Sequence, residues 1–257
     1  MNRELTYLET EPLVAQREWE SDGVVVLQAS VRVPRPVPSA GGVFRRVRRY
    51  YQLQCQAFFR YCQRELLPQA AAEYTAALAC SRPLPDFRAE LDYHVTYNEG
   101  GLWSLYTQTR ETGPGGTFLA RRGDTWDLGA GYPVPASSFF SGGLRKTLLS
   151  AAEAQIQRRQ AAGAGVWRED WRRGLRRYYN PANYYLTEDG FAFFYPMLSI
   201  APASAGIPVF ILPYSEETGR PRVKERSPGA LGTGGWGSAL FYIVHMEQLV
   251  GAVLQGP

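Results

Sequence analysis

Hydrophobic residues recur every three or four positions over one long segment, the spacing that places them on one face of a helix. This apolar stripe consists of Phe44, Val47, Tyr51, Cys55, Phe58, Cys62 and Leu66. Pro68 lacks a backbone N–H donor, so we expect a kink or restart there before the helix resumes over residues 70–80. The same spacing predicts two shorter helices, over residues 144–160 and 167–177.

Elsewhere the apolar and polar positions alternate, which predicts strands. Residues 88–98 and 102–109 form two such segments, and Gly100 and Gly101 between them tolerate positive φ, so we expect an antiparallel hairpin. Residues 24–33 are rich in β-branched side chains and predict an earlier strand.

Glycine-rich segments predict further turns. Residues 112–116 are interpreted as a loop, followed by a hairpin of residues 117–122 and 125–128 that turns at Arg122-Gly123-Asp124. The turn contains a glycine between two polar residues, a common composition at such positions.

A last hairpin is predicted for residues 183–187 and 191–195 around Glu188-Asp189-Gly190, with a final strand over residues 209–214. Gly190 and Gly206 are expected to hold backbone conformations that a Cβ disfavours.

These elements predict an α+β fold, in which antiparallel sheets built from hairpins are packed by one long N-terminal helix and shorter helices. We expect a single domain over residues 24–214, with halves at 24–160 and 165–214. Residues 215–257, which include the glycine-rich run 229–238, are expected to form a flexible tail with a short apolar end.

Composition narrows the classes of function. The formal net charge is +4, but no zinc-finger spacing, Gly-rich phosphate loop or ribonucleoprotein motif accompanies it, so nucleic acid is not an expected partner. The three cysteines form no CxxC pair, and Cys55 and Cys62 would lie about 10 Å apart along a helix. Buried free thiols are therefore expected rather than disulfides.

No targeting or membrane segment is recognised. Residues 1–23 carry five glutamates and no apolar run, unlike a secretory signal. The apolar segment 239–254 is interrupted by His245 and Glu247 and is shorter than the roughly 20 residues of a membrane span. We therefore expect a cytoplasmic protein without a membrane span, acting as a monomer.

One part of the chain resembles a known family. Residues 184–195, YYLTEDGFAFFY, precede SIAPASAGIP at 199–208 and a strand ending in PY at 213–214. This series resembles the C-terminal half of a bacterial domain of unknown function that forms the extracellular part of lysozyme-sensing anti-sigma factors. The domain also accompanies some peptidoglycan deacetylases, and a mycobacterial secreted antigen is a more distant relative. Relatives are mostly exported or membrane-anchored.

The resemblance extends more loosely upstream, to YHVTYN at 93–98 and GLWSL at 101–105. Family members usually carry a TGGAH-like motif in the loop that follows. Here TGPGGT at 112–117 stands in its place, and the histidine is absent.

Candidate acid–base residues are few. Asp92 and His94 project from the polar face of one predicted strand, about 7 Å apart. His245, Glu188 and Asp189 complete the set, but no nucleophile motif or metal-ligand spacing accompanies them. We therefore expect neither a cofactor nor a metal, and an enzyme is the less favoured interpretation.

Binding is the favoured function, because loops on a rigid sheet commonly carry recognition. The candidate binding residues are Thr112, Gly113, Gly115, Gly116, Thr117, Glu188, Asp189, Trp167 and Trp171, the last two beside a cluster of arginines. The resemblance implies that the partner is a muramidase such as lysozyme or a cell-wall glycan. Two alternatives stay open, an intracellular interaction or structural protein and an accessory of a cell-wall hydrolase or deacetylase.

Overall fold

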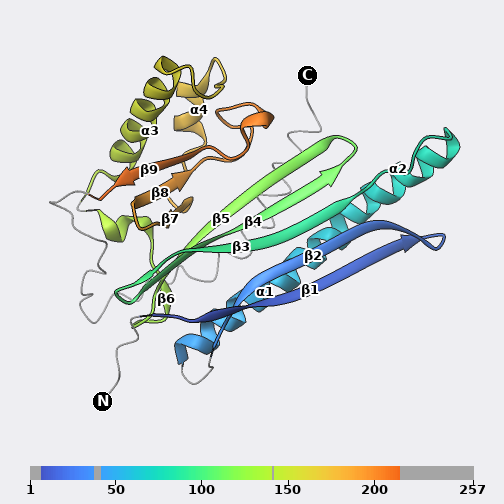
Figure 1. Ribbon diagram of the computed structural model, residues 1–257, viewed down its shortest axis with the longest axis horizontal. Helices are drawn as coiled ribbons and strands as arrows, with labels where there is room; N and C mark the ends of the chain where they lie inside the picture. The colour runs from blue at the N-terminus through green and yellow to red at the C-terminus, as the bar shows by residue number, and fades with distance from the viewer. Residues whose placement is uncertain (1–6, 38–41, 141, 215–257) are drawn as a thin grey trace.

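The computed structural model describes residues 7–37, 42–140 and 142–214, and its largest element is a six-stranded sheet, sheet A (Figure 1). The strands lie in chain order, and every neighbouring pair is antiparallel except β2 and β3. Their bounds are β1 Thr10–Ser21, β2 Val24–Pro36, β3 Arg88–Glu99, β4 Leu102–Gly113, β5 Gly116–Asp127 and β6 Tyr132–Pro133.

A long helix connects the parallel pair, as the wide separation of such strands requires. It consists of α1, Gly42–Tyr61, a π-helical turn, Cys62–Leu66, and α2, Leu67–Ala79. The expected irregularity is thus a π turn immediately before Pro68, where the missing N–H and the ring disfavour regular α-helical bonding.

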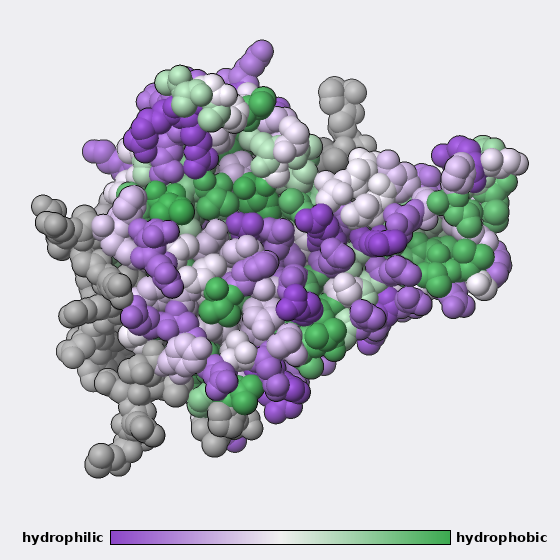
Figure 2. Space-filling model, in the orientation of Figure 1, coloured by the Kyte–Doolittle hydropathy of each residue, from purple (hydrophilic) through white to green (hydrophobic). Residues whose placement is uncertain are grey.

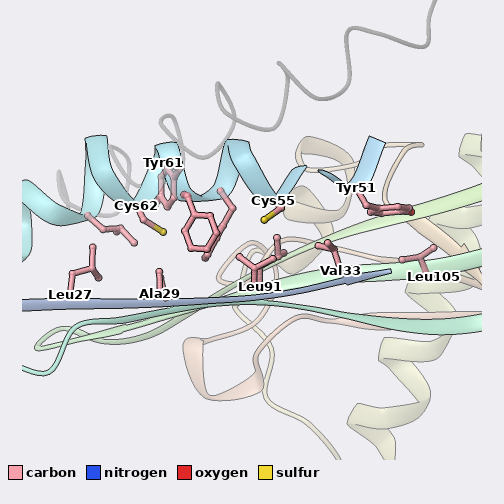
Figure 3. Packing of buried hydrophobic residues seen from close by; sticks show 14 of the residues in the cluster. Leu27, Ala29, Val33, Tyr51, Cys55, Tyr61, Cys62, Leu91 and Leu105 are labelled. Atoms are coloured by element: carbon pink, nitrogen blue, oxygen red, sulfur yellow. The ribbon is translucent and has the colours of Figure 1, made fainter. Parts of the chain in front are cut away.

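The apolar stripe of this helix packs on one face of sheet A and forms the first core. Figure 3 shows Tyr51 and Cys55 on the helix facing Val33, Leu91 and Leu105 on the strands. Burial raises the pKa of the neighbouring Cys62 thiol to about 12, so this cysteine stays protonated. Cys80 is exposed, which corrects the expectation that all three thiols are buried.

The C-terminal part of the described chain forms a second layer with its own core. Its sheet, sheet B, has the order β7-β8-β9 and is covered by two helices. The bounds are α3 Leu144–Ala161, α4 Trp171–Arg177, β7 Tyr184–Leu186, β8 Gly190–Phe194 and β9 Val209–Pro213. In Figure 1 this layer lies above sheet A, away from α1 and α2.

Strand β7 joins the two sheets by lying against β4 and β5 on the face opposite α1. The backbone N–H of Leu186 donates to Ser104 Oγ at 2.9 Å. A Cβ at Gly123 would lie only 1.7 Å from the carbonyl oxygen of Tyr184. The absence of a side chain at Gly123 therefore sets how closely the two sheets approach.

The α+β fold, the hairpin at Gly100-Gly101 and the hairpin of β7 and β8 are confirmed. The predicted turn at residues 122–124 is wrong, because β5 runs unbroken through it and pairs with β4 along its length. The predicted loop 112–116 is in fact a two-residue turn at Pro114-Gly115, because Gly113 and Gly116 pair with each other in the β4–β5 ladder.

Strand β1 was not predicted, and it extends sheet A on the N-terminal side of residue 24. The predicted helix 167–177 begins only at Trp171. The predicted tail 215–257, with its apolar segment 239–254 and His245, lies outside the described residues. Within the part of the chain that is described, no helix is long and apolar enough to cross a membrane.

Candidate binding surfaces

Planar side chains from four strands gather on the face of sheet A that is turned away from α1. We name this group the aromatic–arginine strip, and it consists of His94, Tyr106, Gln108, Arg121 and Tyr185. Side chains alternate between the two faces of a strand. The strip residues of β3, β4 and β5 therefore lie on the face opposite the residues that pack against the helix.

The rings of the strip lie in contact with one another. His94 and Tyr106 are partners in the β3–β4 register, with ring centroids 4.9 Å apart. Tyr185 of β7 approaches the same ring of Tyr106 to 5.0 Å. The guanidinium of Arg121 lies over Tyr106, 4.0 Å from the ring centroid, a close cation–π contact.

Hydrogen bonds fix the orientation of Arg121. Its Nε and Nη2 donate to Oε1 of Gln108 at 3.1 and 2.7 Å. Its Nη1 donates to the hydroxyl of Tyr185 at 3.3 Å. Burial raises the pKa of Tyr185, so this hydroxyl stays protonated and can accept the bond from Arg121.

The strip is open to solvent along part of its length. Tyr185 is only 6% exposed, Tyr106, Gln108 and Arg121 are half-buried, and His94 is exposed. Figure 2 shows one face of the molecule, on which hydrophilic residues cover most of the strands and hydrophobic ones gather beneath the lobe of α3 and α4. The strip therefore offers a rigid surface with both apolar ring area and polar groups.

The predicted binding residues of the β4–β5 turn lie far from the strip. Gln108 and Arg121, the members of the strip nearest the turn, are each four residues from Thr112 and Thr117 along their strands, about 13 Å at the usual rise. Thr112 and Thr117 are cross-strand partners with hydroxyl oxygens 3.4 Å apart, and Gly115 and Gly116 are exposed. Gly113 lies against the ring of Phe87.

The other predicted binding residues belong to the second layer. Glu188 and Asp189 are exposed in the β7–β8 turn, which Thr187 braces through bonds between its Oγ1 and the backbone of Gly190. Trp171 is 4% exposed, and Trp167 stacks on Phe210 with ring centroids 6.1 Å apart. Both indoles therefore pack in the second core, and the structure does not bring the predicted set together.

The two acid–base candidates of β3 have separate partners. Asp92 forms an ion pair with Arg32 at 3.3 Å, and the ring of His94 packs against that of Tyr106 with 35° between the ring planes. In residues 7–37, 42–140 and 142–214, no three His, Cys, Asp or Glu side chains are grouped to hold a metal ion.

A buried polar network that the sequence did not reveal lies between α1 and β5. Asp124 accepts hydrogen bonds from the hydroxyls of Tyr50 at 2.9 Å and Tyr51 at 3.3 Å, and forms an ion pair with Arg122 at 3.2 Å. Burial and the Asp124 carboxylate raise the pKa of both tyrosines. Trp126 donates to the hydroxyl of Tyr51 at 3.2 Å. These groups satisfy one another's hydrogen bonds at the contact between helix and sheet, so removal of one member would leave a buried polar group without its partner.

The sequence did not predict the aromatic–arginine strip either, because Arg121 lies next to residues 122–124, which were predicted to form a turn rather than part of a strand. The period-two spacing of Ser104, Tyr106 and Gln108 was the available signal for a polar outer face of β4. On β5, Arg121, Gly123 and Thr125 are the cross-strand partners on this outer face. Arg122, Asp124 and Trp126 alternate with them and lie on the face toward α1.

Residues 137–215 match a protein family of unknown function, DUF3298. The matched segment covers α3, α4 and sheet B, where the sequence motifs are found. No curated protein matches the chain. The predicted kinship with anti-sigma factors and deacetylases stays a prediction.

Two crystal structures are similar over most of the chain. A DUF3298-family protein from Bacteroides fragilis has a TM-score of 0.57 and 16% identity, covering 82% of this chain and 92% of its own. A second, from Pseudomonas aeruginosa, has a TM-score of 0.52 and 15% identity, covering 80% and 91%. The chain therefore carries a DUF3298 match over residues 137–215 and shares its fold with two proteins of that family.

Proposed function

We propose that the protein is a non-catalytic binding domain that recognises a cell-wall glycan through the aromatic–arginine strip. The observation that carries this proposal is the fixed position of Arg121, clamped over Tyr106 by Gln108 and Tyr185. A binding group that is already held in place loses little entropy when its ligand arrives.

The chemistry of the strip suits a sugar. A pyranose ring has apolar C–H faces that pack on aromatic rings, and hydroxyls that need donors and acceptors. The strip supplies rings from Tyr106 and His94, and polar edges from Arg121 and Gln108. The resemblance of residues 184–214 to cell-wall-associated domains supports the cell wall as the source of the glycan.

The contacts of Asp92 and His94, the two acid–base candidates of β3, favour binding over catalysis. The carboxylate of Asp92 forms an ion pair with Arg32, and the ring of His94 packs at a tilt against that of Tyr106. General acid–base catalysis needs such groups positioned together around a reacting atom, with a nucleophile or charge-stabilising donors beside them.

Calorimetric titration with soluble peptidoglycan fragments tests the proposal. We expect Tyr106→Ala and Arg121→Gln to weaken binding by at least about tenfold, because central aromatic and arginine residues carry most binding energy. Tyr132→Ala removes an exposed tyrosine of β6 and is the matched control, which should bind as wild type does. Failure of the wild type to bind, or equal binding by all variants, would contradict the proposal.

A muramidase bound at the β4–β5 turn is the second candidate, favoured by the exposure of Gly115, Gly116 and Thr117 at the end of sheet A. Pro114→Glu leaves Gly115 and Gly116 of the turn in place but adds a charge to the exposed surface that a protein partner would meet. Loss of muramidase binding in this variant, with glycan binding absent in the wild type, would favour the turn over the strip.

A further inference from the structure

A groove of about 660 Å³ lies between α3 and α4, on a part of the molecule to which the proposed function gives no role. Leu144, Leu149 and Leu175 line it, together with the five charged residues Arg145, Lys146, Glu153, Arg172 and Arg176. Its volume falls within the range of sites for small molecules, roughly 300–1,000 Å³.

The groove carries an excess of positive charge. Among the described residues that line it, Glu153 is the one carboxylate, and it forms an ion pair with Arg172 at 3.1 Å. Within the described ranges, no carboxylate lies within 4 Å of the charged groups of Arg145, Lys146 or Arg176. Three cations that have no carboxylate partner among the described residues therefore face a shared space, and an anion between them would relieve their repulsion.

The helices that present these cations are fixed by the second core. In α4, Trp171 and Leu175 are buried, and a Cβ at Gly174 would lie 2.8 Å from Cγ2 of Ile200. In α3, Leu148 and Ile156 are buried. The two walls of the groove are thus set at a fixed separation by packing.

Aromatic rings orient two of the arginines. The guanidinium of Arg172 lies 4.4 Å from the ring centroid of Trp171, and that of Arg145 lies 5.7 Å from the ring of Tyr179. These contacts limit the positions that the long side chains sample. The arginines come from opposite walls, one from α3 and the other from α4.

We propose that this groove binds a small molecule carrying two linked phosphate groups. Guanidinium groups form paired hydrogen bonds with phosphate oxygens, which a lone ammonium cannot do. Cations on both walls, with only Glu153 opposing them, fit an anion with charge at two places better than a single phosphate. The apolar lining contributed by the leucines leaves room for an uncharged part of the ligand.

Inorganic pyrophosphate is the probe, titrated calorimetrically into the full chain. We expect it to bind at least about fivefold more tightly than inorganic phosphate, and less tightly as salt is raised. Replacing Arg145 and Arg176 with glutamine should weaken pyrophosphate binding by about tenfold or more, since two charge-assisted contacts are lost.

The matched control replaces Arg173 and Arg177, two exposed arginines of α4 that do not line the groove, with glutamine. It removes the same charge and should change the affinity by less than about twofold if the site is local. All four arginines are exposed, so both variants should melt as wild type does.

Three results would overturn the proposal. The wild type could fail to bind pyrophosphate, the control variant could lose as much affinity as the groove variant, or citrate could bind as tightly as pyrophosphate. Tighter binding of a single-stranded oligonucleotide than of pyrophosphate would also contradict it, because the ligand would then be an extended polyanion.

Discussion

Gly123 shows how one missing side chain determines the distance between two layers. Its position between Arg122 and Asp124 predicts a turn residue, but it lies within β5, directly beneath the carbonyl of Tyr184. Gly190 instead permits close pairing inside sheet B, since a Cβ there would lie 2.4 Å from the carbonyl oxygen of Leu212 on β9. Of the two glycines expected to be structural, only Gly206 has a positive φ, +64°.

Gly123→Ala should lower the free energy of unfolding by about 3 kcal/mol or more, because the added methyl must push β7 away from β5. Urea denaturation measures this change. Gly115→Ala is the control, since no atom lies within 4 Å of the added Cβ. Unchanged stability of the Gly123 variant would mean that β7 does not lie against β5.

Glu111 of β4 is a carboxyl group whose burial makes stability depend on pH. Burial raises the pKa of Glu111 to about 7, although the hydroxyl of Tyr61, which donates to it at 3.1 Å, lowers the pKa in part. Because this pKa is above that of an unfolded chain, about 4.3, folding favours the protonated form. The stability that Glu111 contributes is present below about pH 4.5 and is lost as the pH rises through about 7.

Glu111→Gln mimics the protonated form and should remove this loss. We expect the variant to gain melting temperature relative to wild type as the pH is raised from 5 to 8, with little difference at the acidic end. Glu90→Gln, at an exposed glutamate on the neighbouring strand β3, should show no such trend. A difference that does not vary with pH would show that Glu111 is not buried as described.

At the scale of elements, local signals were sufficient where a segment buries a clear face. The helical stripe around Tyr51 and Phe58 and the alternation of β3 both predicted the observed elements. Strand β1 was missed because it lies at the edge of sheet A, and Leu13 and Trp19 are only partly buried. A strand that buries little surface leaves little pattern in its sequence.

Contacts between distant segments could not be predicted. The parallel pairing of β2 with β3 follows from the path of the long helix, and residues 24–33 alone carry no sign of it. The strip brings together Tyr106, Arg121 and Tyr185 only because β7 lies across sheet A. The groove likewise needs α3 and α4 side by side, which neither basic segment implies by itself.

The long helix should contribute strongly to the first core through Phe58, which is 3% exposed. Phe58→Ala should cost about 3–5 kcal/mol, the usual penalty for emptying an aromatic core position. Chemical denaturation of the variant measures it, with Tyr132→Ala as an exposed aromatic control. A cost below about 1 kcal/mol would mean that this residue is not a core residue.

At the scale of the whole molecule, strand β7 joins the two layers through its contacts with β3, β4 and β5. Polar groups lie along this contact. Ser104 accepts from Leu186, and its hydroxyl also lies 2.7 Å from that of Thr125. The aromatic–arginine strip lies on the same face, so that both sheets contribute to it. Proteins with only 15–16% identity share this fold, so its arrangement tolerates wide sequence change.

Native mass spectrometry of the protein incubated with peptidoglycan fragments tests binding without chemistry most directly, because it weighs the complex and the free ligand together. We expect a complex whose mass equals that of the protein plus an unaltered fragment, and its loss in Tyr106→Ala. Absence of a complex would contradict the account. So would fragments that lose an acetyl group or break at a glycosidic bond in the presence of wild type but not of His94→Ala.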